Sequence, residues 1–382
     1  MKFFTGDEAG LIKEISITPS TSQKQEISSQ LSHTIKTWDK IDRNKGIQLM
    51  YQADILGEKN QIIVARKNGI IQILDPNKDG KVYKEFIEEQ INVNNDGKRD
   101  ARFVGLFANK NTLVTCTDKG IVRYQPILED NSSSMNKTIT LTSDLSRLRV
   151  HPKENHIFSC GGKERELSVW DANVWQENNN KDKKKAKIGL LWSAKNENDF
   201  LDLRVPVWIT DLQFLNDVDT TKLVIGSKYH QIRIYDTKAK RRPVQDFNIG
   251  ANPVVSLIVG RNSNEIIFSD TIGSVSSVDI RTGKILGRYK GFTGAVTDIA
   301  IDKKSTSLVT VGLDRFLRVH EMNATRKLTH KIYLKQRQTC VLVDSSEDEI
   351  NHSNENNDSE EDEEELWGNM EEIKPKKKIK NS

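Results

Sequence analysis

The stretch IFSCGGKERELSVWD, residues 157 to 171, contains a short apolar run, a polar turn with two glycines, and an alternating run that ends in Trp-Asp. Alternation of apolar and polar residues with a period of two is typical of a β-strand with one buried face. The stretch therefore predicts a hairpin of two strands. Such a unit cannot bury its faces alone, so it must pack against further sheets.

The same pattern recurs along the chain. Its other copies are residues 3–15, 62–75, 113–125, 223–236, 266–279 and 308–321. Equivalent positions in the seven copies are Ile12, Ile71, Val122, Leu167, Ile232, Val275 and Leu317. They are separated by 59, 51, 45, 65, 43 and 42 residues, close to the ~40–45 residues of a four-stranded propeller blade once loop insertions are allowed.

A further apolar strand precedes each hairpin, as at residues 254–260, and a more polar strand follows it, as at residues 284–290. Units of four strands that recur seven times predict an all-β, seven-bladed propeller, in which each sheet packs against its neighbours. The Trp170-Asp171 ending, with weaker versions at residues 232–236 and 317–321, resembles the WD-repeat family.

The first copy lacks its innermost strand, and the apolar run Thr339 to Val343 is left over after the seventh copy. We expect this run to supply the missing strand and close the ring. The expected organisation is a propeller over residues 1–343 and a disordered tail over residues 344–382. Two insertions, residues 18–32 and 176–187, are polar and are expected to form loops.

Composition narrows the class of protein. No window approaches the ~18 consecutive apolar residues of a membrane span, and the first residues lack a signal-peptide core, so a soluble intracellular protein is expected. The three cysteines, Cys116, Cys160 and Cys340, are far apart and form no CxxC pair. They are expected to be small buried apolar residues rather than disulfide partners or zinc ligands.

Charge is distributed unevenly. Residues 344–382 hold 14 acidic and 5 basic residues, a balance of −9, which leaves +13 for residues 1–343. A basic body is attracted to polyanions, although charge alone does not establish nucleic-acid binding. The tail is acidic over 344–372 and basic over 374–380, where a nuclear import signal is expected. The residues of this signal are Lys374, Lys376, Lys377, Lys378 and Lys380. Candidate phosphorylation sites, each followed by acidic residues, are Ser345, Ser346 and Ser359.

Catalytic motifs are not visible. The sequence has no GxxxxGK[ST], GxSxG or HExxH motif, and its histidines lack ligand-like spacing, so we expect no enzyme, cofactor or metal. Acidic residues at the hairpin turns are expected to cap backbone amides, and histidines at strand ends to make structural hydrogen bonds. These residues are Asp7, Asp118, Asp314, His151, His230 and His320.

The segment NDFLDLRVPVW, residues 198–208, connects the fourth and fifth copies. Propeller connections can vary while the sheets stay rigid, so recognition residues often lie there. Pro206 withdraws a backbone donor and favours a loop or strand entrance. A partner-binding site is predicted at Asp202, Leu203, Arg204, Val205, Pro206 and Trp208. The alternatives are a local ion pair between Asp202 and Arg204, and a Trp208 that wedges between blades or stacks on a base.

Three groups of basic residues are candidates for RNA or another polyanion. The first is Lys238, Lys240, Arg241 and Arg242; the second is Arg147, Arg149 and Lys153; the third is Lys183, Lys184 and Lys185. Arginine can bind phosphate through a paired fork and lysine as a point charge, which suits contact with a nucleic-acid backbone without base reading. A solvated edge that discourages aggregation explains the first group equally well, and a solvated loop explains the third.

Several of these segments, residues 161–171, 198–215, 229–244, 312–320 and 330–340, are similar to the WD repeat-containing protein 74 family and its fungal counterparts, the Nop-seven-associated WD-repeat proteins. The resemblance covers most of the body from the fourth copy onward. It implies a nucleolar factor that joins precursors of the large (60S) ribosomal subunit, contacts ribosomal RNA, ribosomal proteins and assembly factors, and is removed by a AAA-type ATPase.

The sequence therefore predicts a non-enzymatic scaffold in large-subunit assembly, a monomer within a larger complex, located in the nucleus and nucleolus. One alternative is a substrate-recruiting propeller subunit of a protein-modifying complex such as a ubiquitin ligase, which would bind peptides and not RNA. The other is a hydrolase that uses the central channel, which would need clustered catalytic side chains at the inner strand ends.

Overall fold

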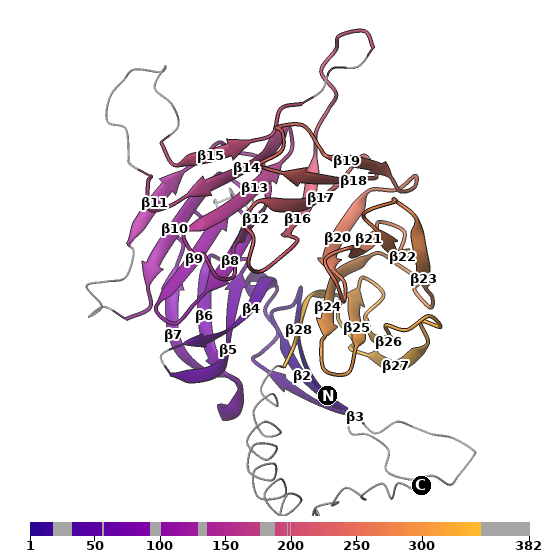
Figure 1. Ribbon diagram of the computed structural model, residues 1–382. Helices are drawn as coiled ribbons and strands as arrows, with labels where there is room; N and C mark the ends of the chain where they lie inside the picture. The colour runs from indigo at the N-terminus through magenta and orange to yellow at the C-terminus, as the bar shows by residue number, and fades with distance from the viewer. Residues whose placement is uncertain are drawn as a thin grey trace, which may run out of the picture. The chain divides into compact units, whose positions relative to one another are not determined.

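The computed structural model describes residues 1–17, 33–55, 57–91, 101–128, 136–175, 188–196, 198 and 200–344. Residues Met1–Val343 form one compact unit. Its strands form seven antiparallel sheets of four strands each, which follow one another around a ring (Figure 1). The predicted seven-bladed propeller is confirmed.

Blades 1 to 4 comprise the following strands. Blade 1 is β28 (Gln338–Val343), β1 (Lys2–Asp7), β2 (Ile12–Ile17) and β3 (His33–Trp38); blade 2 is β4 (Ile47–Ile55), β5 (Glu58–Arg66), β6 (Ile70–Asp75) and β7 (Lys81–Ile87); blade 3 is β8 (Phe103–Ala108), β9 (Thr112–Thr117), β10 (Ile121–Pro126) and β11 (Lys137–Thr140); blade 4 is β12 (Leu145–Val150), β13 (Ile157–Gly162), β14 (Arg165–Asp171) and β15 (Leu190–Ser193).

Blades 5 to 7 continue in the same order. Blade 5 is β16 (Ile209–Phe214), β17 (Lys222–Ser227), β18 (Gln231–Asp236) and β19 (Gln245–Asn248); blade 6 is β20 (Val254–Val259), β21 (Glu265–Asp270), β22 (Val275–Asp279) and β23 (Ile285–Tyr289); blade 7 is β24 (Val296–Asp302), β25 (Ser307–Gly312), β26 (Phe316–Glu321) and β27 (Leu328–Tyr333). Two 3-10 turns, η1 (Arg43–Lys45) and η2 (Pro76–Lys78), lie between strands.

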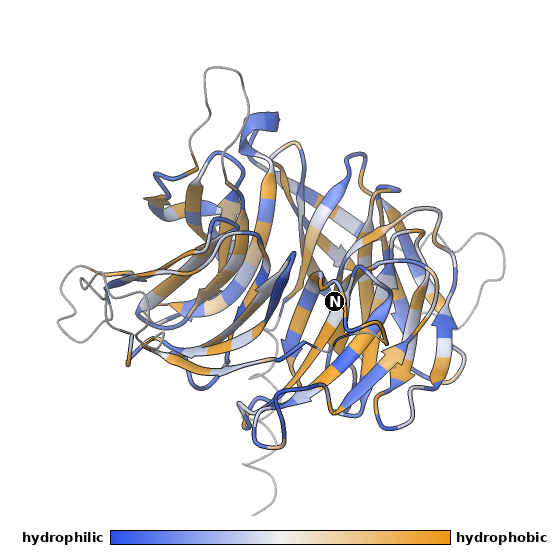
Figure 2. Cartoon of the chain, turned by 90° about the horizontal axis from the view of Figure 1, so that it is seen from above, coloured by the Kyte–Doolittle hydropathy of each residue, from blue (hydrophilic) through white to orange (hydrophobic). Residues whose placement is uncertain are grey.

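Strand alternation explains where the core lies. Most of the buried apolar residues that the structure describes fall into seven clusters, each between two adjacent blades. Phe3 packs against blade 7 and the next residue, Phe4, packs against blade 2, because successive side chains point to opposite faces of a strand. Figure 2 shows apolar residues along the strands around the ring. Each blade is therefore buried on both faces.

The ring closes within blade 1. Strand β28 pairs antiparallel with β1, with Phe4 opposite Leu342 and Thr5 opposite Val341. Val341 contributes to the cluster between blades 7 and 1, and Cys340 to the cluster between blades 1 and 2. The Thr339 hydroxyl also donates a hydrogen bond to the Gly6 carbonyl, although more than 330 residues separate the two in sequence. The first and last strands of the propeller are therefore hydrogen-bonded to each other.

Several expected structural roles are confirmed. Asp7 accepts hydrogen bonds from the amides of Ala9 and Leu11. Asp118 accepts from the amide of Arg102, and Asp314 from that of Phe316. The three cysteines are buried.

Two of the three strand-end histidines also make the hydrogen bonds expected of them. His151 Nδ1 accepts from the Glu154 amide, and His320 Nε2 lies 2.9 Å from the Lys290 carbonyl oxygen. Both rings are fully buried. His230 occupies a turn with a φ of 51°.

These buried histidines predict a loss of stability in mild acid. Burial lowers the pKa of His151 and of His320 below 6.5, so below that pH the unfolded chain binds protons that the folded chain does not. The free energy of unfolding should fall by roughly 1–2 kcal/mol as pH drops from 7 to 5.5. Urea titrations across this range measure it.

The variant His151→Asn isolates one contribution, because its side-chain oxygen can accept from the Glu154 amide but does not titrate. The pH slope of this variant should be smaller than that of the native protein. Glu88 and Glu166, whose pKa values burial raises, act in the opposite direction nearer pH 5, which sets the lower limit of the range. A flat profile between pH 7 and 5.5 contradicts the assignment.

Candidate functional site

The connection between β15 and β16 forms a small projecting finger. Asn198 and Arg204 pair as an isolated antiparallel bridge, and the Asn198 side chain donates a 2.7 Å hydrogen bond to Asp202. The Asn196 side chain donates to the Val205 carbonyl. Asp202 has a φ of 62°, the left-handed conformation that turns the chain at the tip. In Figure 1 this connection extends beyond the strands it joins, at the top of the view. We call residues 196–206 the finger.

Apolar side chains at the tip of the finger face solvent. Phe200 is 94% exposed, Leu201 63% and Leu203 60%. Three large apolar residues so close together are costly to hydrate, and such groups mark surfaces that contact another macromolecule. Val207, by contrast, is buried between blades 4 and 5 and anchors the base of the finger.

The polar residues of the finger differ from one expectation. Arg204 does not pair with Asp202: its Nη2 lies 3.6 Å from Glu166 Oε1 on β14, and Asp202 instead accepts from Asn198. The alternative of a local Asp202–Arg204 ion pair is therefore not what the structure shows. The left-handed turn at Asp202 separates the two side chains, which simple strand alternation would have placed on one face. Leu203 and Pro206 are exposed, and Val205 is half-buried.

Trp208 lies where the finger meets the central channel. The Lys228 ammonium is 3.6 Å from the centroid of its ring, and the Lys163 ammonium is 4.9 Å from it. Lys163 also pairs with Trp208 as an isolated bridge. Ammonium groups against an indole are stabilising, and they occupy the ring that a stacked base would need. Trp170, in contrast, is buried in the core between blades 3 and 4.

The basic turn, residues 237–244, adjoins the finger. Lys238, Lys240, Arg241 and Arg242 are all exposed. The Lys195 amide donates a 2.9 Å hydrogen bond to the Arg241 carbonyl, and Arg241 Nε donates a 2.7 Å hydrogen bond to the Ser193 carbonyl. Two groups of residues that sequence reasoning treated separately thus form one surface across blades 4 and 5.

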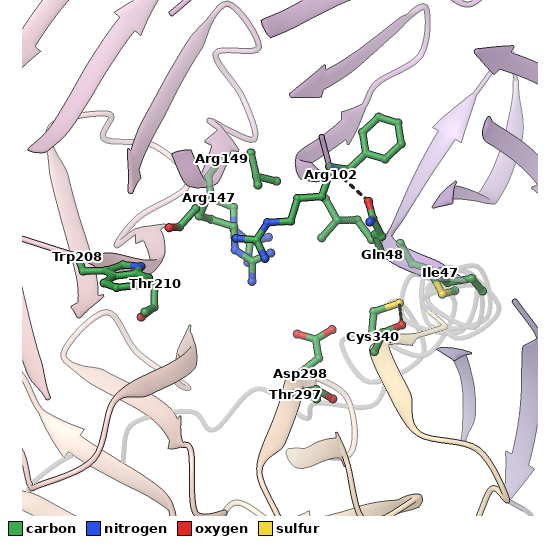
Figure 3. A pocket seen from close by; sticks show the side chains of 16 residues that line it. Ile47, Gln48, Arg102, Arg147, Arg149, Trp208, Thr210, Thr297, Asp298 and Cys340 are labelled. Atoms are coloured by element: carbon green, nitrogen blue, oxygen red, sulfur yellow. Dashed lines mark hydrogen bonds between the residues drawn. The ribbon is translucent and has the colours of Figure 1, made fainter. Parts of the chain in front are cut away.

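The second basic group is divided between two places. Arg147 and Arg149, on β12, line a cavity in the central channel (Figure 3). Lys153 is exposed in the connection that leaves the other end of β12. The three residues therefore do not form a patch, because the strand carries the arginines inward and ends before the lysine. Lys183, Lys184 and Lys185, the three serines from Ser345 onward, and the import lysines from Lys374 onward lie outside the described residues.

Sequence reasoning missed several residues at these sites. Phe200 and Leu201 could have been found, since apolar residues in an otherwise polar connection are a visible signal. Arg102, Asp211 and Asp298 gave no signal, because each lies within an ordinary strand pattern and is brought to the channel by the ring. Among the described residues, no three His, Cys, Asp or Glu side chains are placed to hold a metal ion, and no helix is long and apolar enough to cross a membrane.

A ring of seven blades, each an antiparallel sheet of four strands, is the architecture of a WD-repeat propeller. The WD40 propeller of Doa1 superposes with a TM-score of 0.56 over 78% of this chain and 86% of that chain, at 14% identity. This likeness concerns the fold alone. No protein-family model matches the chain.

Among curated proteins, WD repeat-containing protein 74 of Bos taurus is 37% identical over 71% of this chain and 69% of its own length. Its counterpart in Homo sapiens is 35% identical over the same shares. The ribosome biogenesis protein nsa1 of Schizosaccharomyces pombe is 28% identical over 100% of both chains. The chain belongs to the WD repeat-containing protein 74 family.

Proposed function

We propose that this protein is a non-enzymatic assembly factor in biogenesis of the large ribosomal subunit, and that it acts as a monomer within the precursor particle in the nucleus and nucleolus. Its family membership supports this proposal, since the relative that matches it along its whole length is named a ribosome biogenesis protein. As the family resemblance implies, release by a AAA-type ATPase is part of the proposal.

The observation that carries the proposal is the continuous surface made by the finger and the basic turn. A precursor particle presents both protein and RNA, and this surface offers a different chemistry to each. Phe200, Leu201 and Leu203 can insert into an apolar pocket of a protein partner. The exposed Lys238 and Lys240 nearby can neutralise RNA phosphates without reading bases.

The basic turn is held beside the base of the finger. The Lys195–Arg241 and Arg241–Ser193 hydrogen bonds hold the basic turn of blade 5 against the edge of blade 4. A surface anchored on two sheets loses little conformational entropy on binding. We therefore expect protein and RNA contacts to be made together rather than independently.

Beyond residue 344 the proposal rests on sequence alone. Lys374, Lys376, Lys377, Lys378 and Lys380 would direct nuclear import, and Ser345, Ser346 and Ser359 would accept phosphate. The division into a propeller over residues 1–343 and a separate tail over residues 344–382 is part of the proposal.

Affinity purification of the tagged protein, with and without nuclease, tests the function. The native protein should recover large-subunit precursor RNA together with assembly factors. Phe200→Ser combined with Leu203→Ser should reduce recovery of assembly factors at least about tenfold, because truncating a buried apolar anchor costs more than about 1.4 kcal/mol. Folding should be unaffected, since both side chains are solvated in the free protein.

Ile272→Ser is the matched control. Ile272 is 67% exposed on the turn between β21 and β22 and lies outside the finger, so its loss should leave recovery unchanged. Lys238→Glu with Lys240→Glu should weaken RNA recovery and make the remaining recovery less sensitive to salt, because fewer counterions are released on binding. Recovery of a ubiquitin-ligase core without precursor RNA would rule out the proposed function.

A further inference from the structure

The central channel contains a cavity of ≈ 440 Å³ at the end where the innermost strands begin. Its walls come from residues of β4, β8, β12, β16, β24 and β28 and from Arg102 and Trp208, which directly precede β8 and β16. Four charged residues line it, namely the arginines Arg102, Arg147 and Arg149 and the acid Asp298. Figure 3 shows the three guanidinium groups gathered in the cavity and the Asp298 carboxylate pointing toward them from the opposite wall.

The arginines are incompletely compensated. Arg147 Nε donates a 2.8 Å hydrogen bond to Asp211 Oδ1, and Arg149 Nη2 lies 3.4 Å from the same oxygen. The carboxylate of Asp211 also accepts from the amides of Leu212 and Leu257, so one buried acid serves two guanidinium groups and two amides. Among the described residues, Arg149 Nε has no hydrogen-bond partner.

Electrostatics agree with this arrangement. Burial and the charge of Arg147 lower the pKa of Arg149, whereas the pairing with Asp211 raises the pKa of Arg147. Arg102 extends from the strand edge, with its Nε 3.6 Å from Asp118, and keeps a largely exposed side chain. An anion in the cavity would relieve the repulsion among these cations.

Asp298 supplies the opposite chemistry. Its two oxygens accept from the amides of Ile299 and Val341, and it forms no ion pair with the arginines in the part of the chain that the structure describes. A carboxylate oxygen has more than one lone pair, so each oxygen can accept a further hydrogen bond. A ligand between the two walls must accept from guanidinium groups and donate to a carboxylate.

We propose that this cavity binds phosphate in a protonated form, either free hydrogen phosphate or a phosphate monoester. Its unprotonated oxygens would accept from Arg102, Arg147 and Arg149, and its hydroxyl would donate to Asp298. Paired guanidinium groups suit a tetrahedral oxyanion. The inference does not depend on the proposed function, since it concerns the isolated protein.

Sulfate is the matched probe. It has the size and shape of phosphate but carries no proton at neutral pH, so it would place an oxygen without a hydrogen against the Asp298 carboxylate. Calorimetric titration of the full-length protein, in phosphate-free buffer at constant ionic strength, should show saturable binding of inorganic phosphate. Sulfate should bind at least about tenfold more weakly, since an unmatched buried acceptor costs at least about one hydrogen bond.

Variants place the site. Arg149→Gln should reduce phosphate affinity at least about tenfold, and the fold should persist because Arg147 keeps its pairing with Asp211. Lys153→Gln removes the same charge from the same blade outside the cavity and should change nothing. Asp298→Asn should bring the affinities for phosphate and sulfate close together, because its amide can donate to either ion.

A measurement on the native protein tests the proposal even if a variant fails to fold. Phosphate, but not sulfate, should protect Arg149 from phenylglyoxal, as scored by mass spectrometry. A phosphoserine peptide and its unphosphorylated form should then be tested as competitors of inorganic phosphate. If only the phosphorylated peptide displaces phosphate, the natural ligand is a phosphorylated residue of a partner protein. If neither peptide displaces phosphate, the natural ligand is free phosphate. Equal affinity for phosphate and sulfate, or unchanged affinity in Arg149→Gln, would overturn the proposal.

Discussion

Replacing Asp211 by asparagine should lower the free energy of unfolding by about 3–5 kcal/mol, because it removes one partner of a buried charge cluster. The carboxylate of Asp211 is fully buried. It joins three blades, since it accepts from Arg147 on blade 4, from the amide of Leu212 within blade 5, and from the amide of Leu257 on blade 6. Burial alone would raise its pKa, but Arg147 and Arg149 outweigh burial and lower it.

The cost follows from what the substitution leaves behind. Asparagine has a single acceptor oxygen and no charge, so two half-buried guanidinium groups lose their counterion and one amide loses its acceptor. Urea unfolding, followed by tryptophan fluorescence, measures the effect, with an unchanged m-value showing that the same structure unfolds.

Asp279→Asn is the control for Asp211→Asn. Asp279 also pairs with an arginine, at 2.9 Å from Arg281, but the pair lies at the surface, where solvent screens it. Little change is expected there. An equal loss of unfolding free energy in the two variants would mean that Asp211 does not stabilise the contact between blades.

A chain that ends at Gln336 should be strongly destabilised, by about 5 kcal/mol or more. The truncation removes β28, exposes the hydrogen-bonding edge of β1, and uncovers Phe3 and Phe4 on either side of it. It also removes the amide of Val341 that binds Asp298 and the carbonyl of Gln338 that accepts from Thr297. An open edge of this kind also favours aggregation.

A chain that ends at Asp344 is the control, because it distinguishes the effect of losing β28 from the effect of losing the residues after it. It keeps β28 and lacks only residues 345–382, so it should melt with the full-length protein. The chain that ends at Gln336 should melt roughly 10 °C or more lower, or fail to remain soluble. Similar melting of the two truncated chains would show that the ring does not depend on β28.

Much of this architecture is visible in the sequence because it depends on local geometry. The seven copies are recognisable because the inner strands of each blade are buried on both faces, which leaves short apolar runs separated by polar turns along the sequence. The run Thr339–Val343 stands out because it is an apolar strand that belongs to none of the seven hairpins. In the structure this strand spans Gln338–Val343 and pairs with β1. The capping role of Asp7 is likewise predictable, since it acts within its own turn.

The sites, in contrast, depend on which segments the closed ring brings together. Arg147 and Lys153 are six residues apart, yet the strand between them carries one into the channel and leaves the other exposed beyond its end. Lys195 and Arg241 are far apart in sequence, yet adjacent blades join them by a hydrogen bond. Arg149 and Asp298 line one cavity because β12 and β24 are both innermost strands that face the central channel. Periodicity is a property of neighbouring residues and is written along the chain, whereas contacts across blades arise only when seven sheets close into a ring.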